Sequence, residues 1–347
     1  MPPTDANGCV VLACRDLAAN QAFLESLGFR LRSVFPADDP RELGLAGHGL
    51  AVLLRRSERD GGGHLRLRGT AARTVTAPNG ASIDFASDAP PPPEAPVAAA
   101  FAVHRGDTAT WHTGRAGMLY RDLVPGRLDG HLIASHIRIA RGGPVPDYVH
   151  FHRLAAQALF VLRGEVQVVY EDQGEPFWMR AGDGVLQPPT IRHRVLACSD
   201  GFEVLEVASP AEHLTCVDDE LALPTARRFA MRTFGGQRFW LHRADDAIAR
   251  PAPEQGFAEV DCGIAAASDG AIGVRTLRAA TASADAVSTS DQLRVWFATN
   301  GTAVVNDQPL AAGDTAVLPP HARIALAAPA ADFALVEFGL RADAPHA

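Results

Sequence analysis

An internal repeat constrains the fold of this chain more than any other feature of the sequence. The segments FVLRGEVQVV and AGDGVLQPP return as FATNGTAVV and AGDTAVLPP, at residues 160–169 and 181–189 and then at 297–305 and 312–320. Gly164 corresponds to Gly301 and Asp183 to Asp314, so the period is about 130 residues. A repeat of this length predicts two domains of one fold.

Short segments rich in β-forming residues follow one another from about residue 100, separated by Gly, Pro and Asp. In the first copy of the repeat, the expected strands cover residues 131–140, 158–161, 165–170, 184–186, 193–196 and 202–207. This rhythm is typical of an antiparallel β-sandwich or barrel. The predicted fold class is therefore mainly β, with two barrels in tandem.

Three histidines in the first copy predict a metal site. His150 and His152 are two residues apart, so they leave the same face of a strand. A later strand that carries His193 needs only to lie beside them to complete a pocket. Imidazole is the commonest metal ligand near neutral pH.

The two segments that hold these histidines, GGPVPDYVHFHRLAAQALFVLRGEVQVVY and AGDGVLQPPTIRHRVL, resemble the two signature motifs of the cupin superfamily. The resemblance implies a jelly-roll barrel that binds one Fe, Mn, Ni, Cu or Zn ion. It implies His150, His152 and His193 as metal ligands, with Gln157 at the position usually held by a glutamate.

Gln157 departs from the cupin pattern. An amide neither neutralises a charge of the metal nor acts as a base, so three neutral histidines leave the full charge of a divalent ion. Such a site favours an anionic, chelating ligand. Two interpretations of Gln157 stay open: a weak fourth ligand through its carbonyl oxygen, or a donor that orients water, oxygen or substrate.

The second copy of the repeat lacks the ligands. A direct shift through the repeat places Val287, Thr289 and Arg294 opposite His150, His152 and Gln157, and Ile324 opposite His193. His321 falls opposite Thr190 and is interpreted as a turn residue. The second barrel is therefore predicted to be degenerate and without metal.

Four further residues are candidates for the site. Tyr148 lies two residues before His150 and is expected to share its inward face, where its hydroxyl would meet a substrate oxygen. His136 lies on the preceding strand, with either it or Ser135 facing inward. Arg121 and Arg127 are candidate partners for a carboxylate of the substrate.

The first 88 residues form a different module. RDLAANQAFLESLGFRL and APNGASIDF, within a predicted βαβββ order, resemble one module of the vicinal oxygen chelate family, the glyoxalase and extradiol dioxygenase fold. Its first strand offers no His or Gln and its last only Asp84, so a scaffolding, dimerising or lid role without metal is expected. A proline-rich linker over 89–99 follows, and the two barrels are predicted over 100–222 and 223–347.

Composition limits the partners and the compartment. The chain has 347 residues and a net charge of -8, and all 32 basic residues are arginine, which excludes Schiff-base lysine chemistry. This balance argues against nucleic acid or a membrane as a partner. Five scattered cysteines and the absence of a recognisable signal peptide predict a cytoplasmic protein, and a homodimer is expected.

These observations predict a metal-dependent cupin enzyme. The favoured reaction is oxygen-dependent cleavage or oxidation of a small chelating organic acid, enol or phenol by Fe(II), with Gln157 and Tyr148 orienting oxygen or substrate. One alternative is a non-redox isomerase, cyclase or lyase that uses Zn, Mn or Ni. Another is a non-catalytic bicupin that binds a small molecule.

Overall fold

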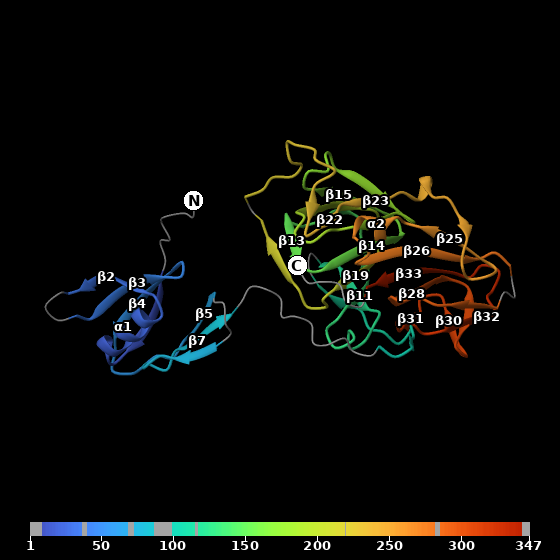
Figure 1. Cartoon of the computed structure of the whole chain (residues 1–347). Helices are drawn as coiled ribbons and strands as arrows, with labels where there is room; N and C mark the ends of the chain where they lie inside the picture. Colours follow the sequence, from blue (N-terminus) through green and yellow to red (C-terminus); the bar gives the residue numbers. More distant parts are fainter. Residues whose placement is uncertain are drawn as a thin grey trace. The chain divides into compact units, whose positions relative to one another are not determined.

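The computed structural model describes residues 9–36, 40–68, 73–86, 99–114, 117–218, 220–281 and 285–341. The chain divides into two compact units, 1–90 and 91–347 (Figure 1). The linker predicted over 89–99 lies, except for its last residue, outside the described residues. None of the described helices has the length and hydropathy needed to cross a membrane.

The first unit contains two small sheets and one helix. A four-stranded sheet has the order β1-β4-β3-β2, and a three-stranded sheet has the order β5-β7-β6. The elements are β1 (Val10–Cys14), α1 (Leu17–Ser26), β2 (Arg30–Phe35), β3 (Glu42–Gly47), β4 (Leu50–Arg56), β5 (His64–Arg68), β6 (Arg73–Thr76) and β7 (Ser82–Ala86).

The order β1-α1-β2-β3-β4 agrees with the predicted βαβββ pattern, and β1 is parallel to β4. Asp16 begins the helix by accepting a hydrogen bond from the backbone of Ala19, and Gly28, at a φ of +98°, follows its end. Strands β5 and β6 were not predicted from the sequence. They separate β7 from the first sheet, because β7 pairs with both of them.

The second unit holds two barrels, each built from a seven-stranded sheet and a smaller sheet. In the first barrel the large sheet has the order β23-β17-β14-β19-β11-β10-β9 and the smaller one β16-β15-β18-β13-β20, with β12 beside β18. These strands are β9 (His112–Thr113), β10 (Leu119–Asp122), β11 (Ile133–Ile139), β12 (Gly143–Pro144), β13 (His150–Arg153), β14 (Ala156–Arg163), β15 (Glu165–Tyr170), β16 (Phe177–Arg180), β17 (Gly184–Leu186), β18 (His193–Cys198), β19 (Phe202–Ser209), β20 (Leu214–Val217) and β23 (Trp240–His242).

The second barrel repeats this plan, with sheets β24-β25-β26-β33-β28-β31-β8 and β27-β32-β29-β30. Its elements are β8 (Ala102–His104), β24 (Arg250–Pro251), β25 (Phe257–Asp261), α2 (Ile264–Ala267), β26 (Ile272–Ala279), β27 (Ala286–Ser288), β28 (Leu293–Asn300), β29 (Thr302–Val305), β30 (Gln308–Ala311), β31 (Thr315–Leu318), β32 (Ile324–Ala327) and β33 (Ala334–Leu340). A short hairpin, β21 (Thr233–Phe234) with β22 (Gln237–Arg238), and a 3-10 turn (Ala244–Asp246) connect the barrels.

The large sheets pack against each other through a shared hydrophobic core (Figure 1). On β14, Ala158 and Phe160 belong to this core together with Val274 and Phe338 of the second barrel. Residues that alternate with them face the inside of the first barrel, because side chains alternate along a strand. One strand therefore supplies both the contact between the barrels and the wall of a cavity.

The two barrels exchange strands. β8, near residue 102, pairs with β31 of the second barrel, whereas β23 pairs with β17 of the first. β8 lies within the range 100–222 predicted for the first barrel but pairs in the second, and β23 lies within the range 223–347 predicted for the second barrel but pairs in the first. Neither the proline-rich linker nor the repeat shows where a flanking strand pairs.

Candidate metal centre and cavity

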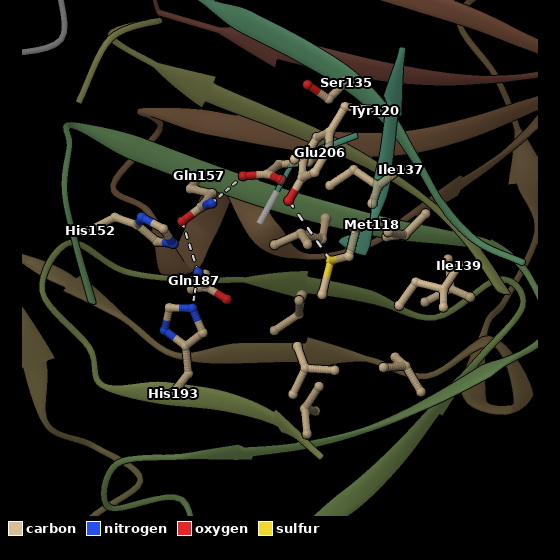
Figure 2. Close-up of a pocket in the computed structure, with 18 of the residues that line it drawn as sticks. Met118, Tyr120, Ser135, Ile137, Ile139, His152, Gln157, Gln187, His193 and Glu206 are labelled. Carbon is tan, nitrogen blue, oxygen red and sulfur yellow. Dashed lines mark hydrogen bonds between the residues drawn. The ribbon is translucent and has the colours of Figure 1, made fainter. Parts of the chain in front are cut away.

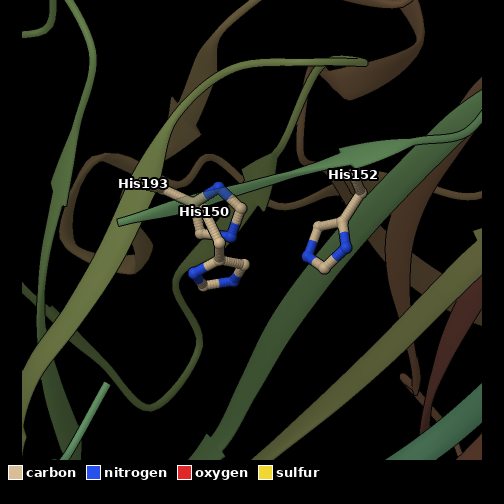
Figure 3. Close-up of side chains that lie close together, drawn as sticks. All are labelled: His150, His152 and His193. Carbon is tan, nitrogen blue, oxygen red and sulfur yellow. The ribbon is translucent and has the colours of Figure 1, made fainter. Parts of the chain in front are cut away.

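The three predicted histidines come together at one place in the first barrel (Figure 3). His150 and His152 lie on β13, and His193 pairs directly with His150 from β18. The ring centroids of His150 and His193 are 4.2 Å apart, and each lies just over 5 Å from that of His152, at 5.2 and 5.3 Å. One ring nitrogen from each histidine lies within 4.8 Å of the other two.

Hydrogen bonds to Nδ1 orient the three rings. The Nδ1 atom of His150 is 2.8 Å from the carbonyl of Tyr148, and that of His193 is 3.0 Å from the carbonyl of Ile191. A carbonyl only accepts, so both rings donate from Nδ1 and keep the lone pair on Nε2. Nδ1 of His152 contacts the hydroxyl of Thr215 at 2.9 Å. This is the usual orientation of a metal-ligating imidazole.

The donor set fits a divalent transition metal. Three histidine nitrogens that bind one ion tetrahedrally, each about 2.1 Å from it, would lie about 3.4 Å apart. The three ring nitrogens lie within 4.8 Å of one another, so a movement of less than about an ångström by each side chain would bring them to that spacing. His150 is fully buried and His193 is 6% exposed. Neutral imidazoles suit Zn, Cu, Fe and Ni alike, so the donor set does not select one ion.

Gln157 lies in a chain of hydrogen bonds beside the histidines (Figure 2). Its Nε2 donates to Oε1 of Glu206 at 2.5 Å, and its Oε1 accepts from Nε2 of Gln187 at 2.9 Å. The same Nε2 of Gln187 is 3.0 Å from Nε2 of His193. The Tyr170 hydroxyl donates to Oε1 of Gln187 at 3.0 Å. Each amide is thus fixed in orientation by the groups on both sides.

The hydrogen bonds that link Tyr170, Gln187, Gln157 and Glu206 have a definite donor-to-acceptor direction. Burial first, and then the charge of Glu206, raise the pKa of Tyr170, so the hydroxyl stays protonated and donates. Gln157 turns its oxygen toward Gln187 and His193, and its nitrogen toward Glu206. Both interpretations of Gln157 remain compatible with this orientation. A metal on Nε2 of His193 would take the lone pair that Gln187 now contacts.

Several residues of the site were not identified from the sequence. Glu206 was not among the predicted site residues, but it lines the cavity, as do Gln187, Tyr170 and His213. The ring of His213 is 5.3 Å from that of His152 and perpendicular to it. The buried carboxylate of Asp147 lies 3.7 Å from Nδ1 of His150. The sequence FEVLEVAS places the carboxylate of Glu206 between apolar neighbours, and this was the one sequence feature that could have indicated its role in the site.

Tyr148 does not line the cavity. Its side chain is 42% exposed, and its ring stands edge-on to His150 at a centroid distance of 5.7 Å. Residues 145–149 precede β13 and are not part of a strand, so the alternation assumed for Tyr148 does not hold there. Its predicted contact with substrate finds no support in this position, whereas Tyr170 lies inside the barrel.

The three predicted substrate-binding residues lie away from the cavity. Arg121 is buried and bonds to the carbonyl of Gly106 and, at 3.0 Å, to Nδ1 of His136. His136 also contacts Glu203 at 2.7 Å and faces the ring of Phe297 in the second barrel at 5.6 Å. Burial, and next the charge of Arg121, lower the pKa of His136 to about 4.

The neighbours of Arg121 and His136 face the cavity in their place. Tyr120 and Ser135 line it, so strand alternation turns Arg121 and His136 toward the second barrel. Arg127, in the turn that follows β10, bonds at 3.0 Å to Asp122 at the end of that strand. The prediction of a substrate-binding role for Arg121, Arg127 and His136 is thus not supported by where they lie, since they stabilise a loop and the contact between barrels.

The second barrel has no comparable cluster among its described residues. Ser288 pairs with Ile324 as His150 pairs with His193, so Ser288, and not Val287, stands opposite His150. The direct shift failed by one residue here, because the stretch from Ser288 to Arg294 is one residue shorter than that from His150 to Gln157.

Comparison with known proteins supports the fold. No family model matches the chain, and no curated protein matches its sequence. A variant of oxalate decarboxylase from Bacillus subtilis matches with a TM-score of 0.51 and 13% identity, over 71% of this chain and 78% of that one. A variant of salicylate 1,2-dioxygenase from Pseudoaminobacter salicylatoxidans matches with a TM-score of 0.50 and 16% identity, over 73% and 86%.

The protein Ylba from E. coli matches with a TM-score of 0.50 and 13% identity, over 70% of this chain and 91% of that one. At such identities the likeness is one of fold. The chain is structurally similar to cupin proteins, and its architecture is the mainly β, two-barrel arrangement predicted from the sequence. A cupin fold with a three-histidine cluster indicates a metal-dependent cupin.

Proposed function

We propose that this protein is an oxygen-dependent cupin dioxygenase that acts on a small, chelating, anionic organic acid, enol or phenol. The observation that carries the proposal is the convergence of three imidazoles, each held through Nδ1, two of which, His152 and His193, line the polar end of a cavity. In this proposal His150, His152 and His193 hold Fe(II). The ion would supply a Lewis acid and one-electron chemistry toward oxygen.

The residues around the histidines perform the remaining tasks. Gln157, held between Glu206 and Gln187, would orient the substrate with an amide whose oxygen accepts from a hydroxyl group and needs no reorganisation during the reaction. Glu206 is the one carboxylate among the described residues that line the cavity. It is therefore our candidate acceptor for a proton from an enol or a phenol.

A non-redox reaction is the second candidate. The same carboxylate beside a metal-bound carbonyl compound would move a proton between carbon and oxygen, as an isomerase or lyase requires. Zn, Mn or Ni would serve there, since none of the ligands demands iron. Oε1 of Glu206 lies 2.5 Å from Nε2 of Gln157, which places the carboxylate close enough to the site for this role.

The first unit is proposed to be a metal-free scaffold, similar to a vicinal oxygen chelate module, that pairs with a second copy of the chain. Asp84 already accepts hydrogen bonds from Thr74 and bonds to His64 at 2.6 Å. The edge strand β2 is exposed along its whole length, and Phe35 on it is 64% exposed. An open edge with apolar side chains supports association.

Anaerobic purification followed by metal analysis and oxygen uptake tests the proposed function. The panel contains catechols, diketones, thiols and hydroxy acids. We expect one ion of iron per chain and oxygen consumption with a chelating acid, enol or phenol. Stoichiometric zinc with no oxygen uptake, but with proton exchange on the same substrates, would favour the non-redox reaction. Tight ligand binding without turnover would leave a binding protein.

A further inference from the structure

The inward-facing residues of the first barrel change from polar to apolar along five strands. On β14 they run Gln157, Leu159, Val161, and on β19 Glu206, Val204, Phe202. On β11, β15 and β18 the corresponding rows are Ser135, Ile137, Ile139, then Tyr170, Val168, Val166, and His193, Val195. Each row begins at the histidine end and continues into aliphatic side chains.

The strand register aligns these rows into layers. Ser135 pairs with Glu206, and Tyr170 pairs with His193, which forms a polar layer. One step further, Ile137 pairs with Val204 and Val168 with Val195. A third layer contains Ile139 opposite Phe202. Two residues along a strand span about 6.6 Å, so the apolar part extends about 13 Å beyond the polar layer.

A cavity of about 390 Å³ runs through these layers (Figure 2). Figure 2 shows Gln157, Gln187, His152 and His193 at one end, with Met118, Ile137 and Ile139 at the other. Met118 and Met179 complete the apolar part, where flexible thioethers adapt to the shape of a guest.

Among the described residues that line the cavity, few charged groups lie beyond the polar layer. Arg194 follows His193 on β18 and is exposed, so its side chain leaves on the outer face. His112 is exposed and stacks on Tyr120 at 5.9 Å. A second carboxylate on the guest would thus be buried among aliphatic side chains without a cation to offset its loss of water.

We propose that the guest is amphipathic: a monoanionic head with two chelating oxygens binds at the polar layer, and an unbranched or aryl apolar tail occupies the two apolar layers. This inference rests on the proposed function, because it places the head at the metal. It excludes short dicarboxylates as the preferred guest. Burial of one methylene contributes about 0.8 kcal/mol, which corresponds to about fourfold in affinity.

Titration calorimetry with straight-chain alkyl hydroxamates tests the tail site. These probes keep one bidentate oxygen head and lengthen the tail from one carbon to about nine. With the metal-loaded full chain, we expect the dissociation constant to fall about fourfold per methylene until the apolar layers are filled, and then to level off. An affinity that is the same for acetohydroxamate and octanohydroxamate overturns the inference.

Three variants sharpen this test. Val168→Phe fills the second layer and should shorten the preferred tail, with acetohydroxamate binding unchanged. Ile137→Ala widens the same layer and should favour longer or branched tails. Gln167→Phe is the matched control, because Gln167 neighbours Val168 on β15 but does not line the cavity. An equal shift in the control would show that the effect does not come from the cavity.

Metal content and the dependence of affinity on tail length together distinguish failure of the metal site from failure of the tail site. If metal is retained and affinity is independent of tail length, the tail site is wrong and the metal site stands. If no metal is retained but fatty carboxylates still bind with a length dependence that Val168→Phe removes, the tail site stands and the chelating head is wrong. If neither metal nor any length dependence is found, both proposals are wrong.

Discussion

Where the first barrel carries Gln157, the second carries Arg294, and where the first carries Glu206, the second carries Glu337. Ser135 of the first barrel corresponds to Arg275 of the second, since each pairs with the glutamate of its own barrel. The second barrel thus keeps the glutamate and places two guanidinium groups around it.

Those guanidinium groups occupy the interior of the second barrel. Arg275 contacts Glu254, Glu259 and Glu337 at 2.9, 2.8 and 2.7 Å. Arg294, only 1% exposed, donates to Ser288 at 2.5 Å, and Ser288 stands where the first barrel has His150. One fold thus accommodates positive charge inside the barrel in two ways: as arginine side chains in the second barrel or, in our proposal, as a bound metal ion in the first.

Removing the histidines should have the largest effect. In the double variant His150→Ala, His193→Ala we expect the loss of stoichiometric metal. Even outer-shell partners of a metal site typically contribute 10- to 100-fold in affinity, so two lost ligands should cost more than about 10⁴-fold. Metal analysis of the purified full chain measures this. His321→Ala, in a turn of the second barrel, is the control, and metal retained by the double variant would refute the site.

Removing Arg275 should destabilise the chain strongly. Arg275→Met leaves Glu254 and Glu337, 3% and 9% exposed at their side chains, without their main cation. Breaking a buried ion pair in this way costs about 3–5 kcal/mol in the free energy of unfolding. Chemical denaturation of the full chain checks this against Arg278→Met, an exposed arginine of the same strand with an expected change below about 0.5 kcal/mol. Equal effects of both would show that the network is not stabilising.

Acid should weaken the contact between the barrels. Because the pKa of His136 is lowered to about 4, the unfolded chain binds a proton at this residue before the folded chain does. The contribution is complete above the ordinary pKa of about 6.5 and is lost as the pH falls toward 4. We expect the free energy of unfolding to fall by about 1–3 kcal/mol more in the native chain than in His136→Gln over this interval. Parallel pH curves would contradict the assignment.

Removing the hydroxyl of Tyr170 should have a small but measurable effect on stability and metal binding, and removing that of Tyr148 should have none. Tyr170→Phe removes the donor to Gln187 inside the first barrel and should cost about 1 kcal/mol in the free energy of unfolding, with weaker metal binding. Tyr148→Phe should change neither quantity measurably, because the Tyr148 side chain is exposed outside the cavity. Denaturation and metal titration of both variants decide this. A larger effect of Tyr148→Phe would return that residue to the site.

The sequence predicted the parts of the molecule that local spacing determines. His150 and His152 follow the alternation of one strand, and the glycines and prolines of the repeat mark the turns that recur in the second barrel. The βαβββ order of the first unit also followed from local patterns. The prediction of the three-histidine cluster required only one further assumption, that the strands now seen as β13 and β18 are neighbours.

The parts that depend on register between distant strands were not predictable. Glu206 meets Gln157 across 49 residues of sequence, and no local pattern shows which face of β19 turns inward. Ser135 and His136 illustrate the same difficulty, since alternation allowed either to face the cavity. Tyr148 was misplaced because the strand begins two residues later, at His150.

The exchanged strands β8 and β23 link the stability of the two barrels. A break of the chain near residue 222 would separate β23 from β17 and β8 from β31, so the large sheet of each barrel would lose an edge strand and expose the strand beneath it. The shared apolar core between the large sheets acts in the same direction. The second unit should therefore melt in a single cooperative transition, and a truncation between the barrels should yield two aggregating fragments rather than two stable domains.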